Sequence, residues 1–272
     1  MTDEIDLKVK NLYALLRSAG RIAIAFSGGV DSAYLLKAAR DVLGDDVLAV
    51  TIHSSVMPDG ENEEASSFCR SIGVRQIVID ADVFGIPGFI SNPPDRCYWC
   101  KKVLFAKIKE EALKNGFTVV ADGSNSDDTK DYRPGAKAAE ELGIISPLKE
   151  CGFTKNDIRI LSKALGLPTW NKPSMACLAS RFPYGEEITP EGIRMVDSAE
   201  KALKNLGLSQ YRVRKFGKKA KIEVMPDEFP VVTGNFAKIT SEFMKFGFDD
   251  VILDPKGYRT GSMNSLLTEV DK

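Results

Sequence analysis

The chain has 272 residues, and its 37 lysines and arginines against 38 aspartates and glutamates give a formal net charge of −1. This balance excludes the strong positive field of a long nucleic-acid track or an anionic-membrane binder. The sequence contains no apolar run near the roughly 18 residues of a membrane span, and its polar start lacks the order of a signal peptide. We therefore expect a cytoplasmic protein, whose five cysteines are buried, metal-bound or reactive rather than in disulfides.

The first half of the chain predicts a parallel α/β sheet. Apolar strand candidates at 22–26, 47–52, 76–79 and 118–121 alternate with helical stretches such as 33–43, 61–72 and 102–114. This alternation is typical of a Rossmann-like sheet covered by helices. Further along, Thr154 and Asp157 form an N-cap pattern for a helix that ends near Gly166.

From Thr189 the pattern changes to that of a small α+β domain. A helix over 189–207 is followed by a predicted hairpin, 211–216 and 221–225, and then by another helix and strand. We predict an ATP-binding domain over 1–180 and a substrate-binding or oligomerisation domain over 181–272. The proline-marked passage between them is a common location for an active site.

A glycine turn after the first strand predicts a phosphate site. The strand runs into Ser27-Gly28-Gly29-Val30-Asp31-Ser32, which opens a helix. Gly28 and Gly29 let the backbone take positive φ and approach a ligand, and the unpaired N–H groups of a helix N-terminus favour an anion. The spacing differs from the Walker and dinucleotide-binding motifs.

This loop resembles the PP-loop of the ATP pyrophosphatases. The resemblance implies ATP cleavage between the α and β phosphates and an adenylated product. Ser27 and Ser32 add hydroxyl donors, and Asp31 is expected to position Mg²⁺ on the diphosphate. Four aspartates between Asp122 and Asp131 follow a predicted strand at the sheet edge where α/β ligands bind, although part of this run is expected to be a solvated loop.

Cys97 and Cys100 form a Cys-x-x-Cys motif at the start of a predicted helix. The helix N-terminus and the adjacent Lys101 and Lys102 favour thiolates by lowering the cysteine pKa. The motif alone is compatible with half a zinc site, a dithiol redox pair or part of an iron–sulfur site. Zinc would usually need two more ligands, and the one histidine, His53, lies in another βα unit.

Cys177 lies in the predicted interdomain passage, whereas we expect Cys69 and Cys151 to be ordinary packing residues. Three cysteines bind a cubane iron–sulfur cluster while leaving one iron without a protein ligand. An open iron takes sulfide, so an adenylating loop paired with such a site predicts activation of a substrate by ATP followed by thiolation.

Several later segments carry a closer resemblance. They are Asp122-Gly123, Asp131-Tyr132-Arg133-Pro134-Gly135, Trp170-Asn171-Lys172, Ser180 to Gly185 after Cys177, Arg212-Val213-Arg214, and Gly257 to Asn264. On these segments and the loop, nearly the whole chain resembles the LarE family. These are ATP-dependent sulfurtransferases that act on pyridinium-3,5-biscarboxylic acid mononucleotide in nickel-pincer nucleotide biosynthesis. The resemblance implies adenylation of a carboxylate, displacement of AMP by sulfide, and a thiocarboxylate product.

The family has two forms that differ in their sulfur source. One gives up the sulfur of a single cysteine, at the position of Cys177, and leaves dehydroalanine. The other holds a 4Fe-4S cluster through three cysteines and transfers a cluster-bound sulfide. Because Cys97 and Cys100 are also present, this chain resembles the second form, with Cys177 as a ligand and sacrificial use of Cys177 as the alternative. Lys101 is expected to neutralise charge on the adenylated carboxylate.

Further residues are expected at the substrate. Arg212 and Arg214, two apart on a predicted strand, point to one face and are suited to grip a phosphate by bidentate bonds, with Ser180 and Arg181 completing the anion pocket. A solvated basic edge strand is the alternative. Three more residues are assigned from the resemblance: Gly123 to ATP, and Glu200 and Glu223 to an acidic position near the substrate or a metal, although glutamates on such elements are surface residues by default.

Three other functions remain open at this stage. A cluster-dependent tRNA thiolase would need a nucleic-acid surface, which the neutral charge does not favour. Amidation by a PP-loop ligase would not explain three cysteines. A non-catalytic ATP-binding regulator with a structural or redox-sensing metal would bind ATP without releasing pyrophosphate. We expect a small-molecule substrate, no nucleic-acid or membrane partner and a homo-oligomer, and the sequence does not identify the sulfide donor.

Overall fold

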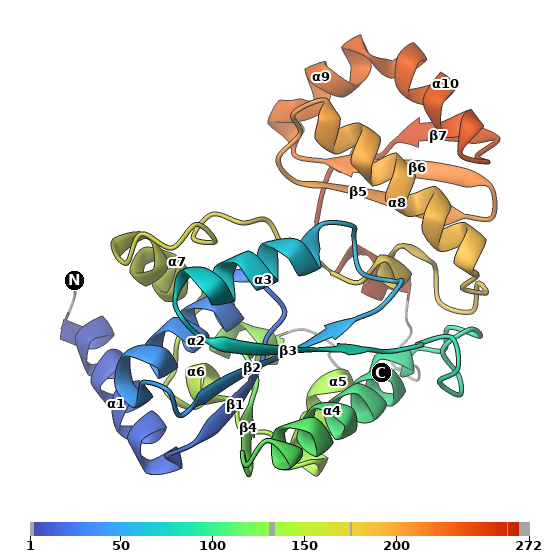
Figure 1. Cartoon of the computed structure of the whole chain (residues 1–272). Helices are drawn as coiled ribbons and strands as arrows, with labels where there is room; N and C mark the ends of the chain where they lie inside the picture. Colours follow the sequence, from blue (N-terminus) through green and yellow to red (C-terminus); the bar gives the residue numbers. More distant parts are fainter. Residues whose placement is uncertain (1–2, 131–133, 175, 260, 267–272) are drawn as a thin grey trace. The chain divides into compact units, whose positions relative to one another are not determined.

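The computed structural model describes residues 3–130, 134–174, 176–259 and 261–266 (Figure 1). The chain divides into two compact units. The first comprises 1–54, 60–82 and 97–174, and the second comprises 55–59, 83–96 and 175–272. This division differs from the predicted domains, 1–180 and 181–272, because two short segments from the first half of the sequence join the second unit.

The first unit is built on a parallel four-stranded sheet with the order β3-β2-β1-β4, which confirms the predicted Rossmann-like fold class. Its strands are β1 (Ile22–Ala25), β2 (Val47–His53), β3 (Arg75–Asp80) and β4 (Val119–Ala121). Alternate residues of β1 serve opposite faces: Ile22 and Ile24 join one hydrophobic cluster, and Ala23 joins another. Both faces are therefore apolar, as expected when helices cover a parallel sheet on both sides.

Helices pack against both faces of this sheet (Figure 1). They are α1 (Asp3–Ala19), α2 (Val30–Leu43), α3 (Glu61–Ser71), α4 (Arg96–Lys114), α5 (Pro134–Glu141), α6 (Pro147–Glu150) and α7 (Lys155–Ala164). The predicted cap at α7 is confirmed. The Thr154 hydroxyl accepts a hydrogen bond from Asp157 N at 3.2 Å, and the Asp157 carboxylate accepts one from Thr154 N at 3.0 Å.

The second unit contains a three-stranded sheet with the order β5-β6-β7. Its elements are α8 (Pro190–Asn205), β5 (Tyr211–Phe216), β6 (Lys219–Val224), α9 (Phe229–Gly234), α10 (Phe236–Lys245) and β7 (Asp250–Leu253). β5 and β6 pair antiparallel, which confirms the hairpin, whereas β7 adds parallel to β6. Helix α8 packs against β5, and both contribute buried side chains such as Val196 and Val213.

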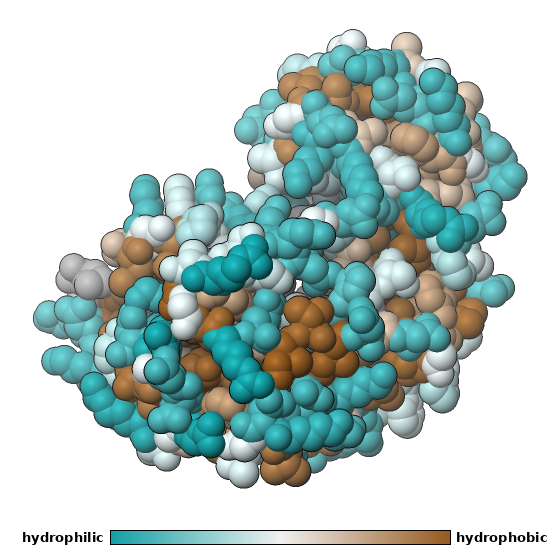
Figure 2. Space-filling view, in the orientation of Figure 1, coloured by the Kyte–Doolittle hydropathy of each residue, from teal (hydrophilic) through white to brown (hydrophobic). Residues whose placement is uncertain are grey.

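The surface carries mixed side chains. Figure 2 shows a mainly hydrophilic face on which hydrophobic residues are exposed in separate patches, as on most proteins. Within the described ranges, every helix is too short or too polar to cross a bilayer.

Candidate active site

The loop that follows β1 lies at a switch point of the sheet. β1 has β2 on one side and β4 on the other. The chain therefore adds strands toward one edge of the sheet up to β3 and then returns to add β4 on the other side of β1. Ligands of open α/β sheets bind at such a point, beyond the carboxyl ends of the strands. The structure thus brings together two segments far apart in sequence, 27–32 after β1 and 122–123 after β4.

The two segments touch through Gly123. A Cβ placed on Gly123 would lie 2.8 Å from Ser32 N and 3.0 Å from Ser32 Cα, so only glycine permits this approach. The predicted ATP residue Gly123 therefore packs against the first turn of α2, a helix N-terminus whose N–H groups favour an anion.

Inside the loop the two serines face each other. The hydroxyl oxygens of Ser27 and Ser32 are 3.1 Å apart, and Ser27 N donates to Ser32 Oγ at 3.3 Å. Gly28 has φ +71°, and Gly29, with extended backbone, is the N-cap of α2. The loop joins two hydroxyls and a helix N-terminus, which is the chemistry of a phosphate site.

Asp31, the predicted Mg²⁺ residue, is largely buried in the first turn of α2. Its Oδ2 accepts a hydrogen bond from the Lys155 ammonium, while Oδ1 is buried without a hydrogen-bonding partner among the described residues. Burial raises the pKa of Asp31, against the positive charge of Lys155. A carboxylate oxygen left without a partner suits a hard divalent cation.

The other aspartates of this region hold the loop after β4 in place. The Asp122 carboxylate accepts from the hydroxyls of Ser124 and Ser146, both at 2.7 Å. Asp127 accepts from Lys155 N at 2.9 Å, and Asp128 accepts from Asn125 N at 3.0 Å. Residues 131–133, including Asp131, and Thr260 of another family segment lie outside the described residues.

Cys97 and Cys100 lie in the first turn of α4, where residues three apart share a face, and both are partly buried. The Lys101 side chain covers Gly135 at the start of α5 so closely that a Cβ there would overlap with Lys101 Cδ. The Lys101 ammonium lies 5.6 Å from the centre of the Phe105 ring.

Cys177 lies in the second unit, immediately before a short 3-10 helix, Leu178–Arg181. Arg181, which has no exposed surface, donates to Cys177 O at 3.1 Å and to Ser180 Oγ at 3.0 Å. It also donates hydrogen bonds to both carboxylate oxygens of Glu200, at 2.8 and 2.7 Å. This bidentate ion pair holds the Arg181 side chain in place, and Arg181 in turn holds the backbone of Cys177 through the hydrogen bond to Cys177 O.

Arg212 and Arg214 are buried on β5, so the alternative of a solvated edge strand is wrong. Arg214 donates to Glu223 Oε2 at 2.9 Å and to Ser180 O at 3.0 Å. Arg212 donates to Tyr211 O at 2.6 Å. Burial, together with the nearby positive charge of Arg181, lowers the pKa of Arg212 to about 10.

Comparison with known proteins decides the family. Residues 1–85 match a PP-loop domain model. The chain is 38% identical, over 96% of its length and 95% of the relative's, to pyridinium-3,5-bisthiocarboxylic acid mononucleotide synthase of Lactiplantibacillus plantarum. The chain belongs to the LarE family. It is also 41% identical, over 97% of the chain and 100% of the relative, to an uncharacterized protein of Synechocystis sp., and 30% identical, over 93% and 97%, to one of Methanocaldococcus jannaschii.

In this LarE-family chain Glu200 and Glu223 are buried partners of arginines, so the default expectation of surface glutamates is wrong. Glu200 also accepts a hydrogen bond from Val213 N at 2.9 Å. Among the described residues, no three or more histidine, cysteine, aspartate or glutamate side chains are grouped so that they could hold a metal.

Sequence reasoning missed two lysines of the LarE-family loop region, Lys155 and Lys172. Lys155 contacts Asp31, which lies 124 positions earlier. Lys172, quoted only as part of a family segment, donates to Gly28 O at 3.3 Å from 144 positions away. Local pattern gives no signal for such pairs, because their partners are chosen by the fold.

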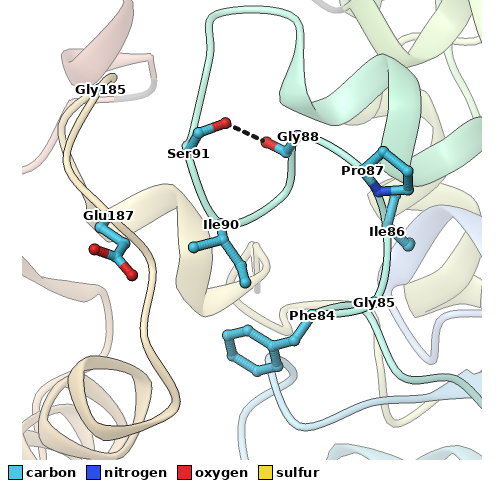
Figure 3. Close-up of a pocket in the computed structure, with 9 residues that line it drawn as sticks. All are labelled: Phe84, Gly85, Ile86, Pro87, Gly88, Ile90, Ser91, Gly185 and Glu187. Carbon is cyan, nitrogen blue, oxygen red and sulfur yellow. Dashed lines mark hydrogen bonds between the residues drawn. The ribbon is translucent and has the colours of Figure 1, made fainter.

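The second unit also contains a cavity of about 570 Å³. Figure 3 shows the side chains of Phe84 and Ile90 among the lining residues, with Glu187 on the facing segment. None of the predicted site residues lines this cavity, so we assign it no part in the chemistry.

Proposed function

We propose that this protein is an ATP-dependent sulfurtransferase that converts a carboxylate of pyridinium-3,5-biscarboxylic acid mononucleotide into a thiocarboxylate, forming AMP and pyrophosphate. One observation carries the proposal: a PP-loop sits at the switch point of the sheet in a chain whose nearly full-length relative is named as the bisthiocarboxylic acid mononucleotide synthase.

In the first step a substrate carboxylate oxygen attacks the α-phosphorus of ATP, and the bond from that phosphorus to the bridging oxygen of pyrophosphate breaks. A carboxylate is already nucleophilic, so no general base is required. The N–H groups at the start of α2 and the hydroxyls of Ser27 and Ser32 are oriented before the reaction and stabilise the charge on the departing diphosphate. Asp31 Oδ1 would hold Mg²⁺, which neutralises phosphate charge.

In the second step sulfide attacks the acyl carbon and AMP leaves with the electrons of the cleaved carbon–oxygen bond. Cys97, Cys100 and Cys177 would hold a 4Fe-4S cluster, whose fourth iron supplies the sulfide when the cluster is bound. Lys101, adjacent to Cys100, would neutralise the acyl-adenylate.

The chemistry of the donor set fits this group, because cysteine thiolates are its usual ligands. Cys97 and Cys100 present two thiols on one turn of α4. Cys177 is the third ligand in this proposal, as in the three-cysteine form that the chain resembles. Donation of sulfur by Cys177 itself is the alternative.

The substrate phosphate would bind at Arg212, with Ser180, Arg181 and Arg214 around it. Burial and the positive charge of Arg181 lower the pKa of Arg212 to about 10. A phosphate dianion would offset that positive charge and matches the planar guanidinium.

The proposal is tested with protein purified without oxygen. Wild type should release pyrophosphate when ATP and the mononucleotide are both present, and mass spectrometry should find the thiocarboxylate when sulfide is supplied as well. ATP binding without pyrophosphate release would instead indicate a regulator.

Iron and sulfide analysis addresses the sulfur source. We expect about four irons per chain, lost in Cys97→Ala, Cys100→Ala and Cys177→Ala. Iron-free protein that still forms product once, with Cys177 converted to dehydroalanine, would establish the sacrificial route.

A further inference from the structure

Lys172 connects the PP-loop to the start of α3. Its ammonium donates to Gly28 O at 3.3 Å, to Glu61 Oε2 at 2.8 Å and to Glu64 Oε2 at 2.9 Å. The Lys172 side chain is only 13% exposed. All four residues belong to the first unit, so a mostly buried cation stands directly beside the predicted phosphate loop.

The backbone around this contact is held firmly. Arg159 donates to Trp170 O at 3.3 Å and to Lys172 O at 3.1 Å, which ties the lysine backbone to α7. On the loop side, a Cβ on Gly28 would lie 3.2 Å from the Cβ of Ala65, so the loop rests against α3. A change of partner at this contact therefore needs movement of side chains and not of the backbone.

The two carboxylates that hold the ammonium differ in exposure. Glu61 is buried at the first position of α3, whereas the Glu64 side chain is 54% exposed. Burial lowers the pKa of Lys172, but the two carboxylates outweigh it and the net shift is upward, so the side chain remains a cation. An exposed ion pair contributes little stability, and therefore Glu64 is the partner that a phosphate displaces most readily.

We propose that Lys172 is a direct ligand of the terminal phosphates of ATP and that Glu64 is the counter-ion it leaves when nucleotide binds. The carboxylate and the phosphate compete for the same ammonium hydrogens, which Glu61 keeps pointed toward the loop. The proposal deepens the proposed function, because it rests on ATP binding at the loop.

The first test is isothermal titration of Lys172→Met with ATP and with AMP, in the presence of Mg²⁺ and without the mononucleotide. Loss of one charged contact should weaken ATP binding roughly tenfold or more and leave AMP binding within about twofold of wild type. Lys8→Met is the matched control, because Lys8 is also mostly buried between two carboxylates, Glu4 and Asp157. It should not change ATP affinity.

The second test separates a phosphate ligand from a purely structural clamp. If Lys172 binds phosphate, Glu64→Gln removes a competitor and ATP binds about two- to fivefold more tightly. Glu63→Gln, with the same charge change at the neighbouring exposed position, should have a smaller effect. If Lys172 only braces the loop, Glu64→Gln weakens ATP binding or leaves it unchanged, and the inference is overturned. Failure of wild type to bind ATP would instead overturn the proposed function.

Discussion

Gly123 and Ser32 approach each other so closely that no side chain fits between them. The 2.8 Å separation between a hypothetical Gly123 Cβ and Ser32 N means that the chain after β4 lies on the backbone of the first turn of α2. This contact joins the segments that follow β4 and β1, so the shape of the predicted phosphate site depends on a residue 91 positions beyond the end of the loop.

Replacement of Gly123 by alanine should disturb both stability and nucleotide binding. The added methyl group must push Ser32 and the α2 turn aside, at a cost of about 1–3 kcal/mol in the free energy of unfolding. ATP affinity should fall with it. Urea unfolding and ATP titration measure the two effects. Gly234→Ala is the control, because a Cβ there meets no atom within 4 Å; equal behaviour of the two variants would show that the approach is not tight.

Local pattern predicted the parts of this site that lie close together in sequence. A buried strand, two glycines and a helix start predicted the loop, because each follows from neighbouring residues. Alternation predicted that Arg212 and Arg214 share a face, but not that this face is buried, since burial depends on what packs over the strand. Lys155 and Lys172 were missed because only the fold brings them to the loop.

The division into units could not be predicted from local pattern either, because it also depends on contacts between segments far apart in the sequence. Segment 83–96 precedes Cys97 in sequence but joins the second unit, through contacts such as that of Asn92 with Pro183 O at 2.7 Å. Composition and periodicity describe neighbouring residues, so they cannot predict a contact between segments so far apart in the sequence.

Asn92 should therefore be important for the backbone that carries Cys177. It is completely buried at φ 52°, and its carbonyl accepts from Gly185 N at 2.9 Å. Asn92→Ala loses the side-chain hydrogen bonds with Pro183 O and Arg96 and is strained at positive φ, so we expect a loss of about 1–3 kcal/mol in the free energy of unfolding. Asn92→Gly removes the same bonds without the strain and should lose less stability in urea. A ranking in which glycine is the worse replacement would show that the backbone conformation is not the cause.

Loss of the Arg181–Glu200 ion pair should lower the free energy of unfolding by more than the changes at Asn92. Glu200→Ala leaves the guanidinium of Arg181 buried without its counter-ion, a change that typically costs about 3–5 kcal/mol. Thermal unfolding should detect it. Asp250→Ala breaks an exposed pair with Lys219 at 2.8 Å and should cause no measurable loss, since water screens that pair. Similar losses in both variants would argue against the buried pair as a structural anchor for Cys177.

The lowered pKa of Arg212 predicts how phosphate binding depends on pH. A bound phosphate favours the charged guanidinium, so affinity should fall as pH rises through about 10 and the free protein loses this proton. The stability effect has the opposite sign. Because the folded-state pKa of Arg212 lies below its ordinary value, the unfolded chain binds more protons in this window. The contribution of Arg212 to the free energy of unfolding therefore increases above pH 10 and is lost as pH falls through that value.

Inorganic phosphate is a suitable probe, because it remains a dianion between about pH 8 and 11 while Arg212 titrates. Calorimetry in buffers of different ionisation enthalpy should show more net proton uptake on binding near pH 10 in wild type than in Arg212→Gln. Lysines and tyrosines also titrate in this range, but they are shared by both proteins, so only the difference between them reports on Arg212. An identical pH profile in the variant would mean that the phosphate does not bind beside this guanidinium.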